Sequence, residues 1–143
     1  MDYSRKSFHL FLASKDTLWI SRQDSIIYRS EKKGIAPLVD YLAGHQPPGE
    51  DVVVYDRVVG NAAALLIGKL PCKVVYTYTV SEIALKTMTA AEIDCHYTNV
   101  TPHIINRTGD GMCPFEKASM GKSADEFLKF LRTSQPPALG TPA

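Results

Sequence analysis

The chain has 143 residues, 45% of them hydrophobic and 22% charged, which is the composition of a globular domain rather than of a disordered or fibrous chain. Its 16 basic and 15 acidic residues leave a net charge of +1, so no overall field favours nucleic acid or an anionic membrane. The three cysteines, Cys72, Cys95 and Cys113, lack close pairing and favour a reduced, cytoplasmic setting. The sequence also lacks the features of a signal peptide and any apolar run near the roughly 18 residues of a membrane helix.

The first part of the chain predicts two helices separated by a hairpin. Apolar residues spaced by three and four indicate a helix over residues 4–14. Alternating apolar and polar residues indicate two strands, 17–21 and 25–29, joined by a tight turn. A second helix is expected after Gly34, with Pro37 in its first turn, where a missing N–H costs little.

The middle of the chain alternates between buried strands and helices. The apolar run Val52–Tyr55 predicts a strand covered on both faces, followed by a helix rich in Ala and Leu over about 60–69. A second such strand is expected over 73–80, with Ser81 as the N-cap of another helix. A last short strand is expected over 95–98.

The remainder predicts an irregular stretch over about 99–112 and a short helix that opens at Cys113 and Pro114. Ser123 with Glu126 three residues later forms a capping box, so a further amphipathic helix begins there. We expect one domain over residues 1–134 and a disordered tail over 135–143.

The order of these elements predicts the fold class. An antiparallel hairpin that leads into alternating strands and helices is typical of an α/β protein. We therefore expect a three-layer α/β/α sandwich around a mixed five-stranded sheet.

Three separated segments carry a resemblance to a known family. They are Lys33-Gly34-Ile35-Ala36-Pro37-Leu38, then Asp56-Arg57-Val58-Val59-Gly60-Asn61-Ala62-Ala63-Ala64, then Asn106-Arg107 with Gly109, Gly111, Cys113-Pro114 and Glu116. Over roughly residues 5 to 120 the chain resembles a family of uncharacterised prokaryotic proteins of cytidine-deaminase-like fold, catalogued as a domain of unknown function. The resemblance implies a cytidine-deaminase-like fold and no particular activity.

The sequence departs from working zinc deaminases at both halves of their metal site. Those enzymes need a His or Cys followed by a catalytic Glu at one helix start, and Pro-Cys-x-x-Cys at the next. Here the first junction reads Lys33-Gly34-Ile35-Ala36-Pro37, and the second reads Asp56-Arg57-Val58-Val59-Gly60-Asn61. The four histidines show no metal-ligand spacing either. We therefore expect no metal, no cofactor and no zinc-dependent deamination.

The junction at Asp56 is the first candidate site. Ligands of parallel α/β sheets collect beyond the carboxyl ends of strands, and Gly60 with Asn61 begins a helix whose N–H groups could hold an anion. Arg57 would then bind the same small anionic or nucleotide-like ligand. In the alternative interpretation Asp56 caps the helix, Gly60 allows close packing and Arg57 pairs with Asp56.

The second candidate site lies in the segment from Asn106 to Glu116. Asn106, Arg107 and Asp110 are polar and stand beside glycines that permit turns. Cys113 falls at the start of a helix, where its thiolate would be favoured and could act as a nucleophile. In the alternative interpretation Cys113 is a small buried residue, and Glu116 satisfies the helix cap.

Three hypotheses for function follow. The leading one is a zinc-free domain of deaminase-like fold that binds a small phosphate-bearing or nucleotide-related ligand. The second is a metal-free enzyme with Cys113 as nucleophile or Asp56 as base, and the third is a regulatory or interaction protein, for which a homo-oligomer is possible. Nucleic acid and membrane are not expected as partners. The expected ligand-binding residues are Lys33, Gly34, Asp56, Arg57, Gly60, Asn61, Asn106, Arg107, Asp110, Cys113 and Glu116.

Overall fold

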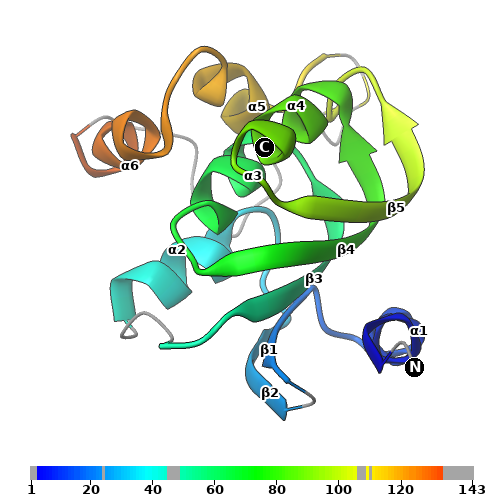
Figure 1. Ribbon diagram of the computed structural model, residues 1–143. Helices are drawn as coiled ribbons and strands as arrows, with labels where there is room; N and C mark the ends of the chain where they lie inside the picture. Colours follow the sequence, from blue (N-terminus) through cyan, green and yellow to red (C-terminus); the bar gives the residue numbers. More distant parts are fainter. Residues whose placement is uncertain (1–2, 24, 45–48, 106–108, 110, 134–143) are drawn as a thin grey trace.

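The computed structural model describes residues 3–23, 25–44, 49–105, 109 and 111–133, which form an α/β domain (Figure 1). The predicted disordered tail, 135–143, lies outside the described residues. Within the described part of the chain, every helix is too short or too polar to cross a bilayer. In chain order the elements are α1 (Tyr3–Ala13), β1 (Leu18–Arg22), β2 (Ser25–Ser30), α2 (Ala36–Gly44), β3 (Val52–Val59), α3 (Asn61–Ile67), β4 (Cys72–Ser81), α4 (Glu82–Ala90), β5 (Asp94–Thr101), α5 (Pro114–Ser119) and α6 (Ala124–Thr133).

The five strands form one mixed sheet in the order β2-β1-β3-β4-β5. Strand β1 pairs antiparallel with both β2 and β3, whereas β3, β4 and β5 run parallel. Parallel strands need crossover connections, which α3 and α4 supply. Because successive right-handed crossovers that advance in one direction lie on one face, both helices cover the same side of the sheet. The predicted mixed five-stranded sheet of an α/β protein is therefore confirmed.

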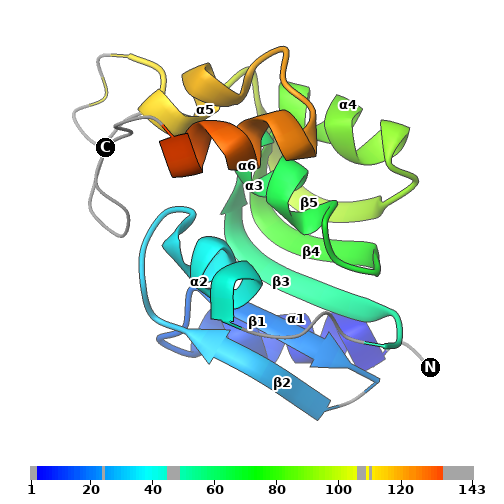
Figure 2. The ribbon, with the colours of Figure 1, turned by 90° about the vertical axis from the view of Figure 1, so that its left-hand side faces the viewer.

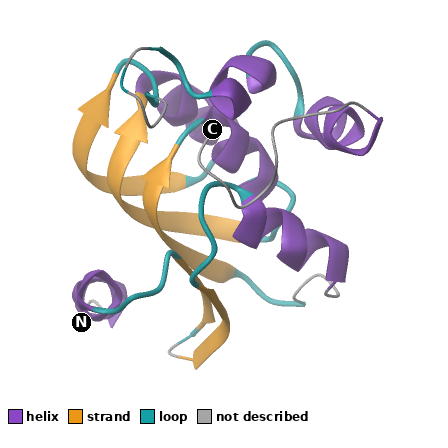
Figure 3. Ribbon diagram, turned by 180° about the vertical axis from the view of Figure 1, so that it is seen from behind, coloured by secondary structure: helices purple, strands orange, loops and turns teal. Residues whose placement is uncertain are grey.

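The helices cover the two faces of the sheet unequally. Figure 3 shows α1, which bears the N-terminus, on one side of the strands and the other helices on the opposite side, and Figure 2 views the latter side. Beneath α1 lies an aromatic core of Phe8, Phe11, Trp19, Tyr55 and Tyr76. The larger core lies on the other face, where all seven residues of α3 are buried between the sheet and the helices α2, α4, α5 and α6.

Local signals predicted the helix starts well. The Ser81 hydroxyl accepts a hydrogen bond from the Ala84 N–H at 3.1 Å, as expected of the N-cap of α4. The capping box before α6 is also present, since the Ser123 and Glu126 side chains each accept a bond from the other's backbone N–H. Both contacts span three residues, so short sequence motifs suffice to predict them.

Two strands, β3 and β5, are much longer than the sequence predicted. Strand β3 continues beyond Tyr55 to Val59, so Asp56 and Arg57 lie inside the strand and not at its end. Strand β5 covers 94–101 instead of 95–98, and the irregular stretch is correspondingly shorter. The error has one cause: polar residues were interpreted as strand ends, whereas pairing with a neighbouring strand extends both elements through them.

Candidate functional site

A cavity of about 220 Å³ lies where β3 ends and α3 begins. Its wall combines the segment before α2, the end of β3, the first turn of α3 and the chain around α5. Most of the lining surface is apolar, and the ionisable side chains come from three distant parts of the sequence. The lining residues are Thr17, Lys33, Gly34, Ile35, Asp56, Arg57, Val58, Gly60, Ala62, Ala63, Ile104, Cys113, Phe115 and Glu116.

Asp56 is the buried carboxyl group on the β3 side of this cavity, and its residue is only 9% exposed. One of its carboxyl oxygens accepts a hydrogen bond from the Arg57 N–H at 2.8 Å, so Asp56 does not cap α3. Burial raises the pKa of Asp56 from the ordinary value of 3.8 to about 8, because the charged form loses hydration. The backbone N–H groups of Arg57 and Val58 and the Arg57 charge oppose this rise. A neutral carboxyl can both donate and accept a hydrogen bond.

The guanidinium group of Arg57 forms hydrogen bonds with carbonyl groups at and just after the C-terminal end of α1. Its Nε donates to the Asp16 carbonyl at 2.9 Å, and its Nη2 donates to the carbonyls of Ser14 and Phe11 at 2.7 and 3.2 Å. The Phe11 carbonyl belongs to the last turn of α1, where helix carbonyls lack partners within the helix, and the other two lie in the segment directly after it. The guanidinium group thus bonds to these carbonyls and not to the Asp56 side chain, and its role as an anion-binding residue stays a prediction.

Glu116 is 1% exposed and joins three segments at the other side of the cavity. Its Oε1 accepts hydrogen bonds from the Asn61 N–H and from the Ser81 hydroxyl at 3.2 Å, and its Oε2 accepts from the Ile104 N–H. The sequence suggested that Glu116 caps its own helix, α5. Instead the carboxylate bonds the first N–H of α3, at the helix end where the sequence predicted an external anion.

Gly60, the N-cap residue of α3, lies so close to this carboxyl group that a side chain has no room there. A Cβ atom at position 60 would lie 2.9 Å from the Glu116 Oε1 and 2.9 Å from the Ile104 Cγ1. Gly60 itself adopts an extended conformation, with φ of −92°, so its requirement is spatial and not conformational. The expectation that Gly60 allows close packing is confirmed.

We expect the Gly60→Ala substitution to lower the free energy of unfolding by roughly 1–3 kcal/mol, because the added methyl group overpacks a closed site. Gly44→Ala is the matched control, since nothing lies within 4 Å of a Cβ placed there. The control should keep or slightly raise stability, because Ala is the better helix former. Urea unfolding of both variants measures the difference, and equal stability would contradict the close approach at Gly60.

Asn61 has a structural role away from the cavity. Its side-chain amide donates to the Ser119 hydroxyl and carbonyl at 3.0 and 3.2 Å, and its amide oxygen accepts from the Thr87 hydroxyl. These bonds connect α3 with α4 and α5. Asn61 is buried and is not among the cavity-lining residues, so its side chain serves packing between helices here, and its place in a ligand site stays a prediction.

Of the remaining predicted site residues, three line the cavity and three lie outside the described part of the chain. Lys33, Gly34 and Cys113 all line the cavity, and Lys33 is exposed at its rim. Gly34 has a φ of +65°, so a side chain there would be strained. Cys113 is partly exposed and its N–H donates to the Ile104 carbonyl at 2.8 Å. The predicted residues Asn106, Arg107 and Asp110 lie outside the described residues.

Sequence patterns missed the apolar part of the wall. Ile104 and Phe115 line the cavity, but isolated apolar residues in a polar stretch gave no signal of a shared site.

The other two cysteines lie outside the cavity wall, and their thiols are held in the unreactive, protonated form. Burial raises the pKa of Cys72 to about 11 and that of Cys95 to about 12. Among the residues that the structure describes, no three His, Cys, Asp or Glu side chains group closely enough to hold a metal ion.

Comparison with known proteins shows the family of the chain. Residues 8–133 match a family described as Domain of unknown function (DUF1893). The chain belongs to the DUF1893 family. The crystal structure of a DUF1893 family protein from Thermotoga maritima is similar, with a TM-score of 0.81 and 24% sequence identity over 92% of this chain and 89% of that chain. At this identity the likeness shows the fold alone. No curated protein matches the chain.

The DUF1893 match runs from α1 to the end of α6, and so includes every segment that lines the cavity. The predicted resemblance to a family of unknown function is confirmed. Because the family description carries no activity, the function has to be argued from the cavity itself.

Proposed function

We propose that this DUF1893 protein binds a small nucleotide-related ligand in the cavity beside Asp56. The planar ring of the ligand enters the cavity, and its phosphate or other anionic group stays at the rim near Lys33. The observation that carries the proposal is a largely apolar cavity with a buried carboxyl group on its wall.

The size of the cavity favours a single ring system. An apolar cavity of about 150 Å³ is known to hold benzene, so about 220 Å³ suits a substituted heterocycle but not an entire nucleotide. The apolar side chains that line it supply the contacts that a planar ring needs, and the neutral carboxyl of Asp56 matches a ring edge with adjacent donor and acceptor atoms.

Charge favours the orientation with the ring inward. Asp56 and Glu116 are the buried acidic residues of the wall, and the Arg57 guanidinium is engaged with carbonyls just beyond the end of α1. A phosphate deep in the cavity would therefore meet carboxyl groups without a compensating cation. Lys33 is exposed at the rim, where an anionic group keeps its hydration and still gains the attraction of the ammonium group.

The sheet order also supports a finer description of the fold as cytidine-deaminase-like, as the sequence resemblance implies. That description adds an analogy for a nucleobase-sized ligand, and we treat it as part of the proposal. A second role, with Cys113 as a nucleophile toward the bound molecule, is supported by its position on the wall of the same cavity as Asp56.

Native mass spectrometry of the freshly purified protein should reveal a retained small molecule, and calorimetry should then show binding of a nucleotide. We expect Lys33→Ala to weaken binding of the nucleotide by about tenfold and to leave binding of the free nucleobase unchanged. Lys32→Ala is the matched control, because Lys32 pairs with Asp40 and does not line the cavity. Asp56→Asn should weaken the nucleobase and the nucleotide alike.

Alkylation of Cys113 gives an independent readout. A bound ligand should slow the reaction of Cys113 with iodoacetamide, whereas buried Cys72 should remain unreactive with or without it. The proposed orientation would be wrong if the Lys33→Ala and Lys32→Ala proteins bound the nucleotide equally well. It would also be wrong if saturating ligand did not slow the alkylation of Cys113. If no nucleobase, nucleoside or nucleotide binds at all, the proposed ligand class is wrong.

A further inference from the structure

Strand β5 is a long edge of the sheet that no described strand covers. It ends the strand order, and it pairs with β4 alone, through seven residue pairs without a register shift (Figure 1). Six of its eight residues are exposed. An edge of this kind presents a row of backbone N–H and C=O groups that can pair with another strand.

The two edges of the sheet differ in their protection against such pairing. At the β2 edge, Ile27 is an unpaired bulge residue between the pairs Ile20–Tyr28 and Ser21–Ile26, and the exposed Arg29 follows it. Bulges and cations are common means of blocking edge-to-edge association. From Cys95 to Thr101, β5 has no bulge, no proline and no lysine, arginine or acidic residue. The β5 edge is therefore the one that lacks protection against pairing with another strand.

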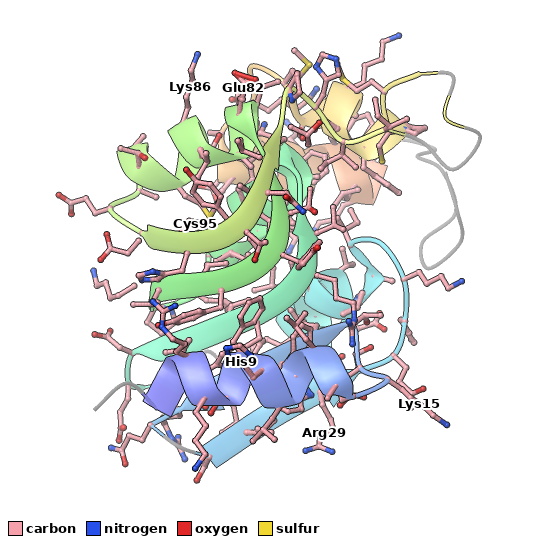
Figure 4. The ribbon with its side chains drawn as sticks, turned by 90° about the vertical axis from the view of Figure 1, so that its right-hand side faces the viewer. His9, Lys15, Arg29, Glu82, Lys86 and Cys95 are labelled. Carbon is pink, nitrogen blue, oxygen red and sulfur yellow. The ribbon has the colours of Figure 1, made fainter. Side chains whose placement is uncertain are left out.

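Exposed apolar side chains stand on both faces of β5. Cys95, labelled in Figure 4, packs toward the larger core beneath α4. His96 stacks on Tyr76 on the α1 face, with 4.7 Å between ring centroids. Because side chains alternate along a strand, Tyr97 shares the α4 side and Val100 the α1 side. Tyr97 is 47% exposed and Val100 is 50% exposed. A strand added beside β5 would cover apolar surface on each face.

The charge of β5 favours an antiparallel partner of the same sequence. Its acidic residue, Asp94, stands at one end of the strand. In a parallel pair of β5 strands the two Asp94 carboxylates would lie side by side, which is unfavourable. In an antiparallel pair they lie at opposite ends, about 20 Å or more apart at ~3.4 Å per residue. An antiparallel pair also repeats the same contacts twice around a twofold axis, as closed dimers do.

We infer that the protein forms a twofold-symmetric dimer in which β5 pairs antiparallel with β5 of a second copy, so that the two sheets become one continuous sheet. This inference is independent of the proposed ligand. We call the paired β5 strands the seam of the dimer. Along the chain the seam is close to the cavity wall, because β5 ends three residues before Ile104, which lines the cavity.

Light scattering after size exclusion, over a series of protein concentrations, measures the association. We expect a mass approaching twice the 15.8 kDa of one chain. Val100→Lys replaces an apolar side chain that the second strand would cover with a charge that pairing would strip of water, and should raise the dimer dissociation constant by about tenfold or more. Ile26→Lys is the matched control on the opposite edge, where Ile26 is 37% exposed, and should leave the constant unchanged.

Two further measurements make the test independent of any one variant. Thr98→Lys introduces the same charge on the same face of β5 and replaces Val100→Lys if that variant does not fold by circular dichroism. In the wild-type protein, hydrogen exchange of the β5 amides should slow as the concentration rises. A monomeric wild-type protein at every concentration, a dimer that tolerates lysine at both positions, or a dimer lost in Ile26→Lys would overturn the inference.

Discussion

Replacing Glu116 with alanine should lower the free energy of unfolding by about 3 kcal/mol or more. The substitution leaves the Asn61 N–H, the Ser81 hydroxyl and the Ile104 N–H without their shared acceptor in a buried site. It also removes the volume that keeps α3, β4 and the segment before α5 together. Urea unfolding monitored by the fluorescence of the single tryptophan measures the loss.

A matched pair of variants separates the hydrogen bonds from the volume. Glu116→Gln keeps the size of the side chain and one acceptor oxygen, but presents an amide donor to a backbone donor, so roughly 1–3 kcal/mol should be lost. Glu82→Ala changes an exposed glutamate in the first turn of α4 and should cost less than about 1 kcal/mol. A Glu116→Ala protein as stable as Glu82→Ala would show that the buried carboxyl group does not hold these segments together.

The Asp56→Asn protein should lose a pH dependence of stability that the wild-type protein shows between about pH 4 and pH 8. The pKa of Asp56 is about 8 in the folded protein and near 3.8 in an unfolded chain, so the folded state binds the proton more tightly. Its contribution to stability is therefore full below pH 4 and is lost as the pH rises through 8. The free energy of unfolding should fall by up to about 1.4 kcal/mol per pH unit within this window.

Asparagine keeps the carbonyl that accepts from the Arg57 N–H and cannot ionise, so the variant should exceed the wild-type stability above pH 8. The measurement is urea unfolding of both proteins at a series of pH values from 5 to about 9. Asp51→Asn is the control, since Asp51 is exposed just before β3 and its substitution should leave the profile unchanged. Parallel profiles for the wild-type and Asp56→Asn proteins would mean that Asp56 is ionised at neutral pH, and the ring-binding role of its neutral form would fail with it.

The sequence predicted those parts of the molecule that depend on near neighbours in the chain. The order of the elements follows from apolar periodicity, and the caps at Ser81 and Ser123 follow from contacts three residues away. The extent of β3 could not be predicted in this way. Asp56 and Arg57 are polar, yet they stay in the strand because pairing with β4 holds them there, 21 residues from Asp56 to its partner Thr77.

The roles of the candidate site residues were harder to predict, because they depend on contacts between distant segments. Glu116 binds the N–H of Asn61, which is 55 residues away, and Arg57 binds the Ser14 carbonyl, which is 43 residues away. The sequence marked these residues as unusual through the family resemblance and the glycines beside them. It could not show that Glu116 itself takes the helix end predicted for a ligand, nor that Arg57 points to the opposite face of the sheet.

The hydrogen bonds of Arg57 have a practical consequence for work with this protein. Asp56 and Arg57 are consecutive residues, so one peptide unit connects the cavity wall with the C-terminal end of α1 on the other side of the sheet. A shortened N-terminus that lacks α1 would remove the Phe11 carbonyl and the Phe11 ring from the guanidinium group, right beside the carboxyl of Asp56. The amino-terminal helix thus belongs in any expressed fragment intended for ligand screening, even though none of its residues touches the cavity.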